Sequence, residues 1–118
     1  MVNTLVEDQF LDRAYGALAD PTRRAVLVAL RSGEARITDL ARPLPMSFAA
    51  VSRHVAVLQG AGLVNREVRG REHWLSLRPE GLSFAEKWLH DQTEFWSRRA
   101  DALHARLARK KVSDGRNR

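Results

Sequence analysis

Apolar side chains recur every three to four residues along most of this chain, which is the spacing of one face of an α-helix. The first such stretch predicts a helix over residues 6–18, with apolar positions Val6, Phe10, Leu11, Ala14, Tyr15 and Leu18. The last and longest stretch, residues 82–108, contains no proline or glycine and predicts a single helix roughly 40 Å long. Between them the pattern predicts three shorter helices and one β-hairpin.

Capping residues mark the first two of the shorter helices. Asp20, followed by proline at the first helical position, predicts the start of one helix, and Gly33 marks its end. The next helix is expected to begin at Thr38. It is short because Pro43 and Pro45 prevent its extension and force a turn.

The third short helix, expected over residues 48–59 with Ser47 as N-cap, has two sides of different chemistry. Val51, Val55 and Leu58 have the spacing of a buried stripe. The opposite side is small and polar, with Ala49, Ser52, Arg53 and Ala56. Small residues let a backbone approach base edges, and an arginine donates to guanine or phosphate. The two short helices predict a helix-turn-helix whose second member reads DNA, with an ordinary surface helix as the alternative.

A hairpin is expected after this helix, because apolar residues alternate on both sides of the triplet Arg69-Gly70-Arg71. Its tip is basic, with Arg66, Arg69 and Arg71 against Glu67. A hairpin directly after a reading helix is typical of a wing whose arginines contact phosphates or the minor groove. A solvated turn is the alternative interpretation.

The long last helix carries an aromatic stripe that a domain of this size cannot bury. Its apolar positions are Phe84, Ala85, Trp88, Leu89, Phe95, Trp96, Ala102, Leu103 and Leu107. The simplest partner is the same helix of a second copy, which predicts a two-fold homodimer with two reading helices one DNA turn apart. An aromatic pocket for an apolar ligand is the competing interpretation, and both can coexist.

Composition narrows these possibilities. The chain of 118 residues is expected to form one domain over 1–108 and a basic, disordered tail over 109–118, since the last 13 residues hold six of the 20 Lys and Arg. Without cysteine, disulfides and thiolate metal sites cannot form. No long apolar run or export signal is present, so we expect a cytoplasmic protein without membrane insertion.

Four segments together resemble the ArsR family of winged-helix transcriptional regulators. They are ALADPTRRAVLVAL (17–30), ITDLARPLPMS (37–47), AVSRHVAVLQGAGLV (50–64) and RGREHWLSL (69–77). The stretch from Trp88 to Asp101 looks like a subgroup often encoded beside START-like lipid-binding-fold proteins. The resemblance implies a mainly α fold with a small β-hairpin, a winged helix-turn-helix with long N- and C-terminal dimerisation helices. It also implies a homodimeric repressor that binds double-stranded operator DNA.

The resemblance also implies which residues act. DNA contacts would come from Ser47, Phe48, Ala49, Ser52, Arg53, Arg69 and Arg71, with His54 packed or contacting phosphate. The dimer interface would include Phe10, Trp88, Phe95, Trp96 and Leu103. Phe48 and Ala49 replace the more usual polar residues, so recognition would rest more on thymine methyl groups, Arg53 and DNA shape.

Other functions have weaker support in the sequence. No cofactor is expected, and no nucleophile with a base, phosphate loop or carboxylate pair indicates an enzyme. Zinc sensing would have to use His and carboxylate ligands of two packed last helices, with candidates His90, Glu94, Asp101 and His104. A ligand- or protein-interaction module that no longer reads DNA is the rival class, and any small-molecule inducer is unknown.

Overall fold

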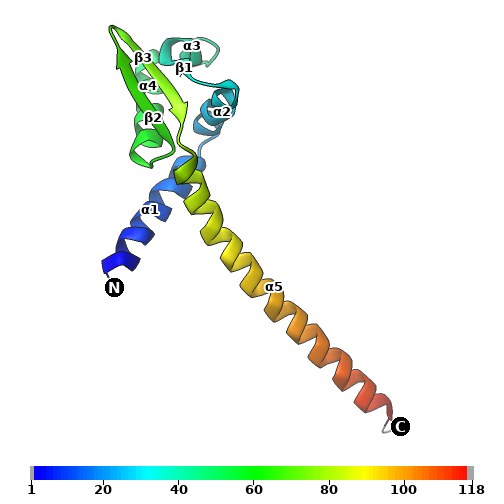
Figure 1. Cartoon of the computed structure of the whole chain (residues 1–118). Helices are drawn as coiled ribbons and strands as arrows, with labels where there is room; N and C mark the ends of the chain where they lie inside the picture. The colour runs from blue at the N-terminus through cyan, green and yellow to red at the C-terminus, as the bar shows by residue number, and fades with distance from the viewer. Residues whose placement is uncertain (1, 117–118) are drawn as a thin grey trace. The chain divides into compact units, whose positions relative to one another are not determined.

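The computed structural model describes residues 2–116, with the side chains of residues 5–112. The chain divides into two compact units, Met1–Ala85 and Glu86–Arg118. The elements, drawn in Figure 1, are α1 (Val2–Leu18), α2 (Pro21–Ala29), the 3-10 turn η1 (Leu30–Ser32), β1 (Ala35–Arg36), α3 (Ile37–Ala41), α4 (Phe48–Gly60), β2 (Val64–Arg69), β3 (Glu72–Leu77) and α5 (Pro79–Arg116). The predicted fold class, mainly helical with a small hairpin, is confirmed.

The end of α1 and the start of α2 lie where the sequence predicts them. α1 starts four residues earlier than expected and ends at Leu18 as predicted. Asp20 has extended backbone angles and its carboxylate accepts a hydrogen bond of 3.0 Å from the Arg23 N–H, which confirms the N-cap of α2. Gly33 follows η1 with a φ of 121°, a conformation that favours glycine.

α3 and α4 form the predicted helix-turn-helix. α3 spans only five residues and is followed by the loop that contains both prolines. α4 begins at Phe48 as predicted and ends at Gly60, one residue later than expected. Gly62, in the turn beyond it, has a φ of 73°.

The hairpin belongs to a three-stranded antiparallel sheet of order β1-β3-β2. β2 and β3 pair from Val64↔Leu77 to Arg69↔Glu72, and Gly70 turns the chain between them with a φ of 63°. The third strand, β1, pairs Ala35 with Leu75. It was not predicted, because two residues are too short to show an alternating pattern.

The core of the first unit lies between α4 and the sheet. Its completely buried side chains are Val51, Val55, Leu58, Leu63 and Leu75. The start of α5 lies directly against the turn after α4, since the Arg78 N–H donates to the Leu63 carbonyl over 2.9 Å. A Cβ on Gly81 would collide with the carbonyl oxygen of Gly62, so this approach requires glycine.

α5 is longer than predicted at both ends. It begins three residues before residue 82 and continues to Arg116, so residues 109–116, expected to be disordered, are helical. The helical signal persists because no proline interrupts the polar sequence after residue 108. The assignment of 109–118 as a separate tail remains a prediction. Among the described residues, no helix has the length and hydropathy needed to cross a membrane.

Candidate nucleic-acid interface

The N-terminus of α4 is fixed by its cap and by its buried side. The Ser47 hydroxyl accepts a hydrogen bond of 3.1 Å from the Ala50 N–H, as the sequence predicted. Val51, Val55 and Leu58 have no exposed surface, which confirms the predicted core stripe. The helix is therefore held rigidly on one side, and its other side is available for a ligand.

That other side is small and exposed. Ala49, Arg53 and Ala56 are exposed, and Ser52 is half-buried. Phe48 adds apolar surface at the first turn, with 51% of its side chain area exposed. Among the described side chains, Arg53 has no hydrogen-bond or ion-pair partner. Its guanidinium is free to bind a ligand.

His54 is committed to contacts within the chain. Its Nδ1 lies 3.7 Å from the Asp20 carboxylate and 3.3 Å from Nη1 of Arg23. Arg23 also donates to the carbonyls of Ala17 and Gly16, over 2.8 and 3.0 Å. The Arg23 backbone N–H, with help from the charges of His54 and Arg23, holds the pKa of Asp20 below its ordinary value. His54 thus links α4 to the cap of α2 and to the end of α1.

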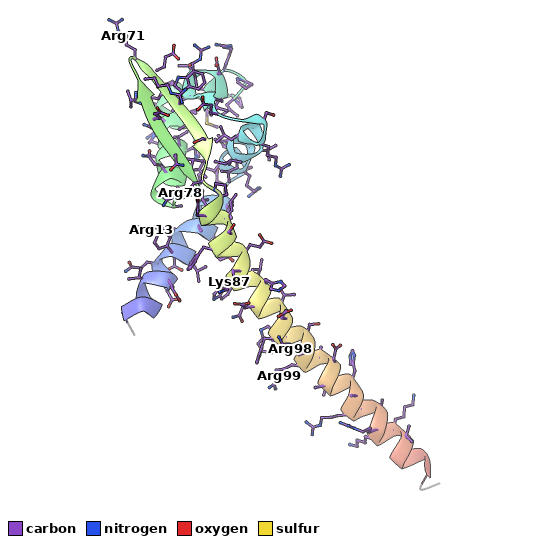
Figure 2. The ribbon with its side chains drawn as sticks, viewed as in Figure 1. Arg13, Arg71, Arg78, Lys87, Arg98 and Arg99 are labelled. Carbon is purple, nitrogen blue, oxygen red and sulfur yellow. The ribbon has the colours of Figure 1, made fainter. Side chains whose placement is uncertain are left out.

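The two arginines at the wing tip differ sharply in their surroundings. Arg69 donates to both oxygens of Glu34 at 2.9 Å and to Glu67 at 2.9 Å, and its guanidinium lies 4.9 Å from the Trp74 ring centre. The hydrogen bonds from Arg69 lower the pKa of Glu34, and those to Glu34 and Glu67 raise the pKa of Arg69. Arg71 makes none of these contacts within the described residues and extends from the hairpin tip in Figure 2.

The sequence alone predicts the same DNA-contacting role for Arg69 and Arg71, although their surroundings differ. The partner that neutralises Arg69 is Glu34, 35 residues away in sequence, in the segment before β1. No local pattern indicates this pairing, because it depends on the unpredicted strand β1. Nearby, Arg36 bonds Asp39 at 3.0 Å and lies 3.6 Å from Glu72, so the base of the wing is a network of paired charges.

The predicted dimer residues fall in both units. In the first unit, Phe10 is 49% exposed and meets Phe84 edge to face with ring centres 6.0 Å apart. These rings border a cavity of about 360 Å³ lined by Val6, Glu7, Phe10, Gly62, Arg78, Glu80, Gly81 and Phe84. In the second unit, large side chains of α5 remain exposed, namely Trp88, Leu89, Phe95, Trp96, Leu103 and Leu107.

Of the candidate zinc ligands, only His90 and Glu94 lie close together within the described residues. His90 Nε2 lies 3.6 Å from Glu94, whose other oxygen accepts from Arg98 at 3.2 Å. Asp101 and His104 make no contact with them within the described residues. In the same part of the chain, no three His, Cys, Asp or Glu side chains come together as a metal site would require.

A short capped helix after a tight turn, followed by a hairpin with a free basic residue at its tip, defines a winged helix-turn-helix DNA-binding protein. Residues 20–66 match the family described as bacterial regulatory protein, arsR family. The chain belongs to this arsR family of transcriptional regulators.

Two relatives and one solved structure agree with this assignment. The HTH-type transcriptional regulator Rv2034 of Mycobacterium tuberculosis is 42% identical over 87 residues, which are 74% of this chain and 78% of the relative. The arsenical resistance operon repressor of Escherichia coli is 30% identical over 87% of this chain and 90% of its own length. The crystal structure of the ArsR family transcriptional regulator RHA00566 has a TM-score of 0.73 and 34% identity, covering 76% of this chain and 93% of that one.

Proposed function

We propose that this protein is a homodimeric repressor that binds operator DNA with the N-terminal half of α4 in the major groove and the tip of the wing against the adjacent backbone or minor groove. The observation that carries the proposal is the exposed side of α4, where small residues surround Arg53, which has no partner among the described side chains. This is the arrangement that a reading helix needs to approach base edges.

On α4 each proposed contact has a distinct role. The exposed Ser47 and the half-buried Ser52 donate to phosphate or base oxygens, and Arg53 donates to a guanine. Phe48 and Ala49 contact thymine methyl groups, since both are apolar and exposed. His54 acts indirectly by holding α4 against α2, because its ring already faces Asp20 and Arg23.

On the wing, Arg71 is the proposed DNA contact, and Arg69 is not. Arg69 already meets two carboxylates and an aromatic ring, so a phosphate would have to displace Glu34 or Glu67 to reach it. Arg71 has no such competitor among the described groups. Arg71→Ala is expected to weaken binding to all sequences. It should also lower by about 1 the salt slope, which is the steepness with which the logarithm of the DNA-binding constant falls with the logarithm of the salt concentration. Arg69→Ala should change this slope little.

The homodimer is supported by the apolar side of α5. Its six large side chains from Trp88 to Leu107 are exposed in a single chain, and contiguous apolar surface of this kind is typical of an interface. A two-fold dimer presents two reading helices to successive major grooves. Repression, rather than activation, is proposed because the relative from Escherichia coli is named a repressor.

Selection of bound fragments from a random DNA pool tests the reading function. We expect a palindromic site with half-sites one helical turn apart. Arg53→Ala should then cost roughly 1–3 kcal/mol on the selected site and less on random DNA. Lys87→Ala is the matched control, because Lys87 is also basic, exposed and unpaired within the described residues but lies on α5, away from its apolar stripe. Equal affinity for selected and random DNA at moderate salt would favour the rival module that does not read DNA.

The proposal also covers the location of the protein, catalysis and the signal that releases it from DNA. A regulator of chromosomal DNA works in the cytoplasm, and no catalytic role is proposed. The inducing signal is left open. The zinc-responsive alternative has no additional support, since only His90 and Glu94 of its four candidate residues pair within the described part of one chain. Stoichiometric zinc in the purified protein, together with zinc-dependent loss of DNA binding, would restore that alternative.

A further inference from the structure

The two faces of the wing carry different residues. Directly opposed residues of antiparallel strands point to the same face, so Arg66 lies on the face of its partner Leu75, which is completely buried. His73 is two residues before Leu75 on β3 and therefore shares this inner face. Arg66 and His73 are diagonal neighbours, with Cα atoms expected roughly 7–8 Å apart.

Both of these polar side chains are left without partners. Nε and Nη2 of Arg66 and Nδ1 of His73 are buried, and they are the buried side-chain nitrogens or oxygens for which the described residues offer no hydrogen bond. Two buried guanidinium nitrogens without partners are costly, since buried donors in native proteins are nearly always satisfied. By contrast, Arg36 and Arg69 both meet carboxylates.

Within the described residues, the elements packed around this position offer Arg66 no unpaired carboxylate. The acidic residues of the hairpin, Glu67 and Glu72, lie on the outer face, where they pair across the strands with Trp74 and Arg69. β2 packs beside α4, which has no acidic residue, and β3 packs beside α3, whose Asp39 already accepts from Arg36 and Arg42. A negative charge for Arg66 therefore has to come from outside these elements.

We propose that Arg66 and His73 form an anion site on the inner face of the wing, which binds a phosphate of the DNA backbone when α4 lies in the groove. The inference rests on the proposed function and adds a contact between the reading helix and the wing tip. Arg66 supplies the charge. To meet the phosphate its side chain turns outward, so that the buried Nε and Nη2 become donors, and His73 adds a third donor when Nδ1 carries its proton. Because the ligand is a phosphate, the site adds affinity without reading sequence.

The first test is Arg66→Met, which keeps the length of the side chain and removes its charge. We expect about tenfold weaker binding to selected and random DNA alike and a salt slope lower by about 1. The free variant should unfold at the same temperature as the wild type or higher, because two buried donors without partners are removed. Arg66→Lys should retain the slope, and the control Arg13→Met, on α1, should change neither quantity. An unchanged slope in Arg66→Met, or a lower unfolding temperature without loss of DNA affinity, would overturn the proposal.

Thermal unfolding in inorganic phosphate tests the anion site independently of DNA reading. At constant ionic strength, phosphate should raise the unfolding temperature of the DNA-free wild type and have less effect on Arg66→Met and on His73→Leu. If phosphate has this effect but no DNA binds specifically, the anion site stands and the reading function fails. If specific DNA binding is found but phosphate stabilises all variants equally and the slope of Arg66→Met is normal, the reading function stands and the anion site is wrong.

Discussion

The reading helix α4 and the long helix α5 are both amphipathic, but only α4 covers its apolar side within the chain. Val51, Val55 and Leu58 have no exposed surface, whereas the large apolar side chains of α5 from Trp88 to Leu107 are 44–62% exposed. Hydrophobic burial is the main driving force of folding, so α4 is stabilised by its own domain. In the proposed dimer, α5 obtains the same stabilisation from a second chain.

The arrangement along α5 supports this difference. At 100° per residue, the six large apolar side chains fall within roughly 120° of the helix circumference. Phe95 and Trp96 also contact each other edge to face, with ring centres 5.3 Å apart. A stripe of this width matches one packed neighbour. In the proposed function the two helices therefore have different roles: α4 positions donors for DNA, and α5 sets the spacing between two copies.

The largest expected effect comes from removing one leucine side chain from the buried side of α4. Leu58→Ala should lower the free energy of unfolding by roughly 2–5 kcal/mol, because it leaves a cavity in the core. Leu103→Ala, at a position 54% exposed, should cost less than about 1 kcal/mol when measured at a protein concentration where the chain is monomeric. Urea unfolding followed by circular dichroism compares the two, and equal losses would remove the contrast between the helices.

The next largest effect is on assembly. Leu103→Arg should weaken the dimer about a hundredfold or more, because the new charge would be buried without a partner in the interface, at a cost of about 3 kcal/mol. Tight operator binding should be lost with it. Ala105→Arg is the matched control, since it adds the same side chain nearly opposite on the helix. Analytical ultracentrifugation measures both, and a stable dimer of Leu103→Arg would place the interface elsewhere.

The sequence was informative wherever a signal is local. Asp20 and Ser47 are caps in the structure, Gly70 has the left-handed conformation of a tight turn, and the stripe of α4 is buried. Each of these depends on a few neighbouring residues and on backbone chemistry. The helix-turn-helix and wing could be predicted from them because they are built from such short signals.

The sequence was less informative about the partners of charged residues. The pairing of Arg69 with Glu34 and the position of Arg66 on the inner face depend on strand register and on contacts between distant segments. A shift of one residue in register would exchange the two faces, and no pattern of basic residues at the wing tip contains that information. The end of α5 also differs from the prediction: the helix continues to Arg116 and not to residue 108, because polar composition alone does not end a helix.

A smaller effect is expected from the cap that orients α4. Ser47→Ala should lower the free energy of unfolding by about 1 kcal/mol, since the Ala50 N–H loses its acceptor. DNA affinity should fall by more than this stability loss explains, because Ser47 also faces the proposed groove. Ser47→Asp retains an acceptor for the cap but adds a negative charge, so it should restore stability and not DNA binding. Recovery of both would show that the hydroxyl only caps the helix.

The smallest effect concerns how α4 is held against α2. The Asp20 carboxyl has a pKa below its ordinary value because it accepts from the Arg23 N–H and faces the charges of His54 and Arg23. A lowered pKa in the folded state stabilises the fold above the ordinary range of aspartate, near pH 4, and this contribution disappears as the pH falls through the folded value. Asp20→Asn keeps a capping oxygen and removes the charge. The variant should therefore be slightly less stable than the wild type at neutral pH, and the two should converge in acid. Thermal unfolding across this pH range measures the difference, and a gap that stays constant down to pH 2 would show that the charge of Asp20 does not help to hold α4 in place.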